Sequence, residues 1–383
     1  MSPRHGAVDP DDQRHSESSD DLGGSFADGW PGDDSEHGDD TPSDSAAGRS
    51  KRQRSPWRRA LIIVLISGLV LGLGAVGAFW FFTERYLGNV ERIANPFQDL
   101  DDSQRPAPAS PTGDPPVTFL LVGSDSRDPS GVGPPGDRSD VIMLMRITGN
   151  RQHVQFISIP RDSWVAIPGY GLNKINASYA FGGPSLLIQT VEAVTSVRID
   201  HFAAVDFAGF KEITDALGGV DVQVAETTSQ GGVTFTEGLN HLNGEEALIY
   251  VRQRKGLPGG DLDRVQRQQN YLRAIMNTVF QQNMLGDLGR TDDLLLALTS
   301  AISVDETLNN TDMLGLVYSL SGLDRSSLNF LTVPVAGLGR EGAASVVYID
   351  ATQAAPMWAY LQQDELALHL QEFGEDLLPD VPY

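Results

Sequence analysis

The sequence predicts an α/β protein, a layered α/β/α sandwich with a central mixed sheet, preceded by one transmembrane helix and a disordered N-terminal tail. Short apolar runs bounded by Gly and Pro alternate with segments of helical periodicity from Val117 onward. Residues 60–82 form a charge-free apolar run, and the residues before it are strongly polar. Alternating strands and helices of this kind favour a sheet with helices on both faces.

Residues 1–59 are predicted to be a disordered, acidic cytoplasmic tail that ends in a basic cluster. Acidic residues dominate residues 1–48, where Arg4 and Arg14 are the only basic ones, and the chain as a whole carries a net charge of −23. A segment with so few apolar side chains cannot bury enough surface to offset its ordering entropy. The sign of the charge then reverses between Arg49 and Arg59.

Residues 60–82, ALIIVLISGLVLGLGAVGAFWFF, are predicted to form the transmembrane helix. A run of this length spans roughly 30 Å of hydrocarbon as a helix. The basic cluster before it indicates a cytoplasmic N-terminus. A cleaved signal peptide is the alternative, but such segments are shorter and do not follow a long tail. We therefore expect a single-pass protein of the cell membrane whose remaining residues are extracytoplasmic.

A linker and one domain are predicted after the apolar run. Residues 83–115 end in DDSQRPAPASPTGDPP, a composition typical of a semi-rigid spacer. We expect this linker to lift a domain of residues 116–383 off the membrane. This domain contains no internal repeat and no break that would divide it in two.

Apolar periodicity predicts the elements of the domain. Gly149-Asn150, between VIMLMRI and HVQFISI, predicts a tight connection between antiparallel neighbours. Further strands are expected at 202–207, 220–224 and 327–333. Helices are expected at 184–195, 210–217, Asn243 to Arg252, from near Asp263, and at 291–304, 311–322 and 353–363. Asn243 is expected to cap the N-terminus of its helix.

Carboxylates stand at the ends of the first two predicted strands of the domain. Asp125 follows VTFLLVGS, and Asp140 opens the next strand. Mg²⁺ is typically held by one or two carboxylates together with phosphate oxygens and water, which suits this pair. The alternative is that Asp125 caps a turn and Asp140 pairs with Arg138.

Arginines and glutamines accompany these acids at the ends of elements. Guanidinium groups match phosphate oxygens bidentately, so a pyrophosphate is a natural occupant of such a set. Structural salt bridges are the alternative for any one of them. The set comprises Arg127, Arg138, Arg161, Arg252, Arg254, Arg264 and Arg267, with Gln268 and Gln269 beside the last of them.

Several function classes are disfavoured. The chain has no cysteine, no GxSxG elbow and no P-loop pattern, so no covalent nucleophile stands out. Its acidity makes it a poor partner for nucleic acid, and we expect none. A direct displacement on phosphorus proceeds without a covalent intermediate. Metal and arginine charges stabilise the negative charge of its transition state.

The sequence resembles the LytR-CpsA-Psr family of membrane-anchored cell-envelope proteins of Gram-positive bacteria, and the source it suggests is actinobacterial. The resemblance covers roughly residues 117–350. Its motifs are FLLVGSDSR, RSDVIMLMRI, FISIPRDSWVAIPG, KINASYAFGG, LNGEEALIYVRQRKG and DLDRVQRQQ.

The resemblance implies a metal-dependent phosphotransferase. This enzyme would move an anionic glycopolymer from a polyprenyl-pyrophosphate carrier to a peptidoglycan hydroxyl through a phosphodiester link. Asp125 and Asp140 would hold Mg²⁺ or Mn²⁺, and Asp261 of the DxxR step is the general-base candidate, with Arg264, Arg138 and Arg161 acting beside it. The pyrophosphate would be bound by Arg138, Arg161, Lys174, Asn176, Arg252, Arg254, Arg264 and Gln268.

Two other functions fit the same residues. Water in place of the sugar hydroxyl would make the protein a polyprenyl-pyrophosphate hydrolase. A domain that binds the lipid pyrophosphate without chemistry would be an envelope regulator.

Overall fold

The computed structural model describes residues 67–70, 72–73, 81, 83–109, 114–124, 139–281 and 288–383. The predicted acidic tail, most of the apolar run 60–82 and the loop 125–138 lie outside these residues. Within the described residues, no helix is long and apolar enough to cross a bilayer. The transmembrane helix therefore stays a prediction from the sequence.

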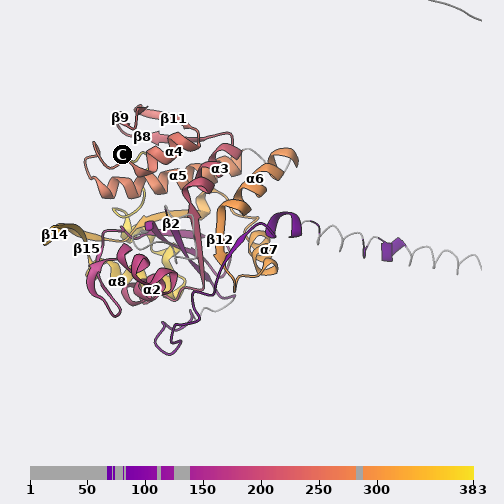
Figure 1. The fold of residues 1–383 in the computed structure, drawn as a ribbon, viewed down its shortest axis with the longest axis horizontal. Coiled ribbons are helices and arrows are strands. Elements are labelled where there is room, and N and C mark those ends of the chain that lie inside the picture. The colour runs from indigo at the N-terminus through magenta and orange to yellow at the C-terminus, as the bar shows by residue number, and fades with distance from the viewer. Residues whose placement is uncertain are drawn as a thin grey trace, which may run out of the picture. The chain divides into compact units, whose positions relative to one another are not determined.

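A mixed sheet forms the centre of the fold (Figure 1). Among the described residues it has seven strands in the order β1-β12-β7-β2-β3-β4-β13. The pairs β1/β12, β2/β7 and β4/β13 are parallel, and the other neighbours are antiparallel. The strands are β1 (Glu91–Ile93), β2 (Val117–Ser124), β3 (Ser139–Ile147), β4 (Val154–Ser158), β7 (His201–Asp206), β12 (Ile302–Asp305) and β13 (Leu328–Thr332).

Both faces of the sheet are buried. Side chains alternate between the faces along a strand, so Leu120 and Val122 of β2 enter one core while Phe119 enters another. In β3, Leu144 and Met143 divide in the same way. Central strands buried on two sides appear as nearly continuous apolar runs, which is why these segments could be predicted.

Helices cover both faces. Against one face pack α2 (Asn176–Thr195) and α8 (Ala351–Gln363), and against the other pack α7 (Asn310–Ser319) and the short π-helix η1 (Thr83–Leu87). Helix α2 is kinked at Gly182 and Gly183, and its second part begins at Pro184. This position matches the predicted helix start, because proline is tolerated in the first turn of a helix. The predicted mixed sheet with covering helices is confirmed.

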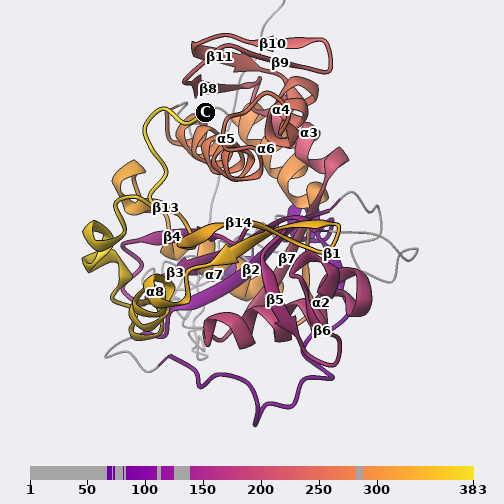
Figure 2. The same ribbon diagram turned by 90° about the vertical axis from the view of Figure 1, so that its left-hand side faces the viewer.

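A second layer of helices lies beyond one end of the strands and is covered by two hairpins (Figure 2). Their apolar faces share a third core. Asn243 and Glu246 form a capping box that starts α4, so the predicted Asn cap is confirmed. The elements are α3 (Phe207–Ala216), α4 (Gly244–Arg252), α5 (Asp261–Gln281) and α6 (Leu288–Ala301), with hairpins β8 (Val220–Val224)/β11 (Gly238–Leu242) and β9 (Thr228–Gln230)/β10 (Val233–Phe235).

Several elements differ from the prediction. Residues 302–304, assigned to the end of a helix, belong to β12, where Ile302 and Val304 pair with β7. The connection at Gly149-Asn150 does join antiparallel neighbours. The short elements that periodicity did not predict are β5 (Trp164–Ile167), β6 (Gly171–Lys174), β14 (Val335–Glu341), β15 (Ala344–Ile349), η3 (Arg325–Ser327), η4 (Leu366–Leu368) and η5 (Leu370–Phe373).

Much of the predicted linker 83–115 is folded onto the domain. Strand β1 joins the edge of the sheet beside β12. Further along, Phe97 and Leu100 pack against the core that contains α2. The Arg105 guanidinium then donates to Glu192 of α2 at 2.7 Å. Composition suggested a spacer here, but these contacts place residues 83–105 in the folded structure.

Gln269 attaches α5 to the central sheet. Its side chain is buried, and its Nε2 donates to the Ser158 hydroxyl at 2.9 Å and to the Leu331 carbonyl at 2.6 Å. These partners lie at the ends of β4 and β13. Gln269 therefore fixes the first half of α5 above the edge where these strands end.

Replacing Gln269 with alanine should lower the free energy of unfolding by about 2–4 kcal/mol, because buried polar partners lose their hydrogen bonds. Thermal and urea unfolding of the full chain in detergent would measure the change. Gln281→Ala, an exposed position on the same helix, serves as the control and should leave stability unchanged. Equal stability of the two variants would contradict this role of Gln269.

Candidate functional site

The predicted site residues gather at one end of the strands of the central sheet. At this end β2, β4 and β7 finish and β3 begins, as the pairing of β2 and β3 with their neighbours requires. Ser124 lies opposite both Ser139 and Asp206. Asp125 directly follows Ser124 and Arg138 directly precedes Ser139, but both lie outside the described residues. Their assigned roles stay predictions.

Asp140 and Arg161 form an ion pair at this end. Arg161 follows β4, and its Nη1 donates to Asp140 Oδ1. Both side chains are largely buried, with exposed fractions of 16% for Arg161 and 18% for Asp140. Arg161 Nε is buried, lies 4.0 Å from Asp162 Oδ1 and has no hydrogen-bond partner among the residues that the structure describes. A buried donor without a partner favours an acceptor supplied by a ligand.

Lys174 and Asn176 contact the two residues Arg161 and Asp162 that follow β4. The Asn176 N–H donates to the Arg161 carbonyl at 3.2 Å, and the Lys174 ammonium lies 3.1 Å from Asp162 Oδ1. Asp162 is a site residue that the sequence analysis missed. Its place directly after Arg161 in the IPRD motif was the available signal.

Asp261 and Arg264 occupy the first turn of α5. Arg264 Nη2 lies 2.8 Å from Asp261 Oδ1 and 3.1 Å from Oδ2, and Arg264 is almost fully buried. Arg264 Nε is buried without a hydrogen-bond partner, like the Nε of Arg161. The first turn of a helix also directs its own N–H groups toward an anion.

The charged residues around Arg161 and those in the first turn of α5 shift one another's pKa values, so they form one site. Burial raises the pKa of Asp261, and the Asp162 charge raises it further while Arg264 and Arg161 oppose it. Burial likewise lowers the pKa of Arg264 to about 10, with Arg161 adding to the effect and Asp261 and Asp140 opposing it. Residues about a hundred positions apart therefore act on one another directly.

The remaining predicted residues lie around this group. Arg254 is about half exposed and its Nη1 lies 4.0 Å from Asp261 Oδ1, so it stands at the rim. Arg252 is placed over the Phe207 ring at 4.5 Å, at the start of α3. Gln268 Nε2 donates to the Val251 carbonyl at 3.4 Å. These side chains flank the site without forming part of the buried pairs.

Arg267, which the sequence grouped with the phosphate-binding arginines, is a structural residue. It is fully buried in the third core, where it donates to Gln253 at 2.7 Å and to Thr228 at 2.9 Å. Its guanidinium also lies 4.5 Å from the centre of the Tyr250 ring. One helical turn separates it from Arg264, but the two side chains serve different surroundings. The grouping was wrong for Arg267.

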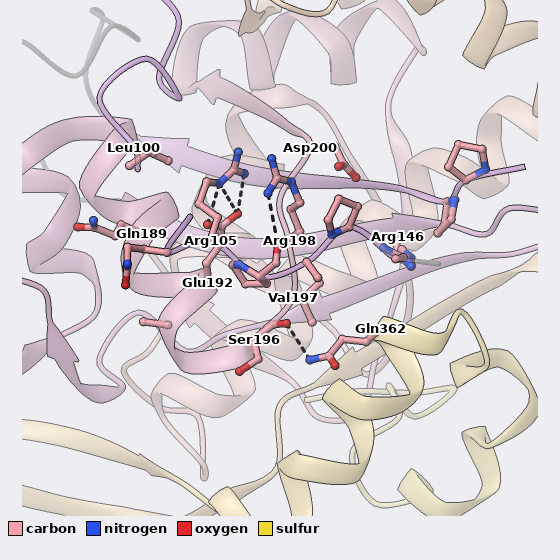
Figure 3. Close-up of a pocket in the computed structure, with 18 of the residues that line it drawn as sticks. Leu100, Arg105, Arg146, Gln189, Glu192, Ser196, Val197, Arg198, Asp200 and Gln362 are labelled. Carbon is pink, nitrogen blue, oxygen red and sulfur yellow. Dashed lines mark hydrogen bonds and ion pairs between the residues drawn. The ribbon is translucent and has the colours of Figure 1, made fainter. Parts of the chain in front are cut away.

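Two cavities of the described structure lie away from these residues. One of about 590 Å³ opens at the opposite end of the strands, between α2 and the residues before β2 (Figure 3). Its main charges are paired, Arg105 with Glu192 and Arg198 with Asp102. None of the predicted site residues lines it. The chemistry of the side chains, and not cavity size, identifies the candidate site.

A magnesium ion is compatible with the donor set but not identified by it. Among the described residues there is no group of three or more His, Cys, Asp or Glu side chains that could hold a metal. Mg²⁺ bound chiefly through phosphate and water requires only one or two carboxylates. Asp140 offers one such carboxylate at the site.

The chain is similar to known proteins of cell wall biosynthesis. LcpA of Corynebacterium glutamicum, a cell wall biosynthesis protein, is 29% identical over 82% of this chain and 67% of its own length. The polyisoprenyl-teichoic acid–peptidoglycan teichoic acid transferase TagU of Bacillus subtilis is 34% identical over 60% of this chain and 72% of its own length. The solved structure of B. subtilis TagT bound to LI-WTA superposes with a TM-score of 0.52 and 25% identity, over 70% of this chain and 93% of TagT.

The model of the LytR_cpsA_psr family matches residues 89–363. That range includes the central sheet, α5 and every predicted site residue. It begins within the segment that the sequence assigned to a linker, in agreement with the packing of β1. This chain belongs to the LytR-CpsA-Psr family.

Proposed function

We propose that this protein transfers an anionic glycopolymer from a polyprenyl-pyrophosphate carrier to a hydroxyl group of peptidoglycan, forming a phosphodiester link. The names of TagU and LcpA and the ligand of TagT support the reaction class. The observation that carries the proposal is local. Two buried guanidinium groups, on Arg161 and Arg264, have Nε atoms without a hydrogen-bond partner among the described residues, and both groups interact electrostatically with a carboxylate of raised pKa.

The guanidinium groups account for pyrophosphate binding. Arg161 and Arg264 each have an N–H available for a phosphate oxygen, in a site shielded from water. Charge-assisted hydrogen bonds of this kind are about twice as strong as neutral ones. Lys174, Arg252 and Arg254 add positive charge around them. Asn176 and Gln268, with Arg138 from the loop, complete the proposed binding set.

Asp261 is the general base in this proposal. It takes the proton of the peptidoglycan hydroxyl, whose oxygen then forms a bond to the phosphorus that bears the glycopolymer. The bridging P–O bond of the pyrophosphate breaks, and polyprenyl phosphate leaves. A carboxylate of raised pKa is a better proton acceptor near neutral pH than an exposed one. Arg264 holds the carboxylate in place before the transfer and remains beside the phosphate afterwards.

Asp125 and Asp140 would hold Mg²⁺ or Mn²⁺. When bound, this cation would neutralise part of the pyrophosphate charge. Asp140 is already oriented by Arg161, so the same guanidinium links the carboxylate to the phosphate site. The role of Asp125 follows from its position directly after β2.

The proposed place of action is the outer surface of the cell membrane. Residues 60–82 would anchor the chain as a single span, with the N-terminus cytoplasmic and the catalytic domain extracytoplasmic. This topology brings the enzyme to a donor that lies in the membrane and an acceptor that lies outside it. The basic residues before the apolar run support the orientation.

Arg161→Met should weaken the binding of inorganic pyrophosphate about 10- to 100-fold, the loss expected for a charge-assisted hydrogen bond in a buried site. Calorimetric titration in the presence of Mg²⁺ measures it. Arg340→Met, an exposed arginine on β14, is the matched control and should bind as the unmodified protein does. Unchanged affinity of the Arg161 variant would remove this residue from the site.

Replacing Asp125 and Asp140 together with alanine should lower the transfer rate on the order of 10²–10³-fold or more, because charge on the pyrophosphate is left uncompensated. The assay uses a defined lipid-linked donor and peptidoglycan, with Mg²⁺ or Mn²⁺ supplied. Asp293→Ala, an exposed acid on α6, is the control. Normal turnover of the double variant would refute the metal assignment. Release of free glycan phosphate without a glycan–peptidoglycan product would identify a hydrolase.

The transfer rate should fall as the pH falls through the raised pKa of Asp261, because only the ionised carboxylate accepts a proton. The acid limb should thus lie above the ordinary aspartate value of 3.8. Asp261→Asn should lose about 10²–10⁴-fold in rate and show no such limb. A rate profile from pH 4 to 9 for both proteins decides it. An unchanged limb in the Asn variant would assign the titration to another group.

A further inference from the structure

The chain is attached to the folded domain directly after the apolar run. The junction, residues 83–93, comprises η1, a short turn and β1. Arg85 forms two hydrogen bonds to the Asp292 carboxylate of α6, at 3.1 Å and 2.6 Å, and Tyr86 donates a third. Leu87 is buried in the core beneath α7. The chain is therefore held from the first turn of η1 onward.

The attachment continues through β1. Arg92 donates to the Leu308 carbonyl and to the Asn310 side chain, and it lies 3.6 Å from the Met313 sulfur. These partners form the entry and the first turn of α7. Since β1 also pairs with β12, the junction is fixed to two separate elements of the domain.

The position of the junction leaves no length for a stalk. The predicted span ends at Phe82, and Arg85 is the first residue paired with the domain. Three extended residues reach roughly 10 Å. The surface around η1 therefore lies within about that distance of the membrane if residues 60–82 form the anchor.

Helix α7 provides a suitable surface beside the junction. It lies on the same side of the domain as η1 (Figure 1), and both elements contribute side chains to one core. Val317 and Tyr318 are 68% and 82% exposed, high values for large apolar side chains. Tyrosine is enriched where membrane and water meet, because its ring is apolar and its hydroxyl polar. The nearest exposed positions, Gly315, Ser321 and Gly322, carry no charge, and the exposed charges of this region, Asp312, Asp324 and Arg325, stand further along the chain on either side.

We propose that the folded domain rests on the phospholipid surface through α7 and the junction, and is not raised on a stalk. This inference rests on the proposed membrane anchor. Contact of the domain with the phospholipid surface would also set the distance of the candidate site from the membrane. Glu91 of β1 lies level with Ser303, Ala204 and Val122 across the sheet, near the end that carries the site. Four strand spacings separate β1 from β3, or roughly 20 Å.

The absence of cysteine allows a direct test in the full chain. Tyr318→Cys introduces one thiol for an environment-sensitive fluorophore, and Leu338→Cys on β14, 60% exposed and on another side of the domain, is the matched control. Both proteins are placed in vesicles of phosphatidylcholine and phosphatidylglycerol that contain a spin-labelled lipid. We expect several-fold stronger quenching at position 318 than at position 338.

A second variant tests the junction itself. An insertion of about ten Gly and Ser residues between Phe82 and Thr83 should release the domain and reduce quenching at position 318 to the level of position 338. Unchanged quenching would show that the junction does not seat the domain. Equal quenching at both positions in protein that floats with the vesicles overturns the seating but leaves the anchor. Protein that does not float overturns the anchor and the seating with it.

Discussion

The buried ion pair of Asp261 and Arg264 is the interaction on which the site depends. Removing two charges from water costs several kcal/mol for each ion, and mutual attraction offsets this only in part. The raised pKa of Asp261 and the lowered pKa of Arg264 show the uncompensated remainder. An anionic ligand with oxygens near Arg264 Nε would supply the missing partner. The site is thus arranged for a third charged group.

Helix α5 holds the Asp261–Arg264 pair in place because its side chains contact three different parts of the protein. Its first turn carries the Asp261–Arg264 pair, Arg267 fills the third core, and Gln269 attaches the helix to β4 and β13. The position of Asp261 relative to Arg161 therefore depends on hydrogen bonds made elsewhere along the helix. Residues of one helix, within nine positions of one another, join the sheet to the layer of helices above it.

The folded junction alters how the domain relates to its lipid-linked donor. A stalk would let the site move freely above the membrane, and each encounter would require orientation. With the proposed anchor, a domain fixed through Arg85 and Arg92 would have its orientation set in advance, which would reduce the entropy that binding must overcome. Composition alone suggested a spacer, because Pro, Ser and Asp do not reveal whether neighbouring Leu87 and Val90 have a core to enter.

The sequence by itself determined the strands buried on two faces, the antiparallel connection at Gly149-Asn150, the cap at Asn243 and the identities of the charged residues. These features arise from periodicity, turn chemistry and motifs, which depend on residues close together in the chain. Strand β1 and the hairpins β5/β6, β9/β10 and β14/β15 escaped prediction because tertiary pairing, and not local propensity, stabilises them. Only the tertiary structure separated Arg264 from Arg267 and added Asp162 to the site. Those distinctions depend on burial and on the electrostatic interaction between Arg161 and Asp261, a hundred residues apart in sequence, which no local pattern records.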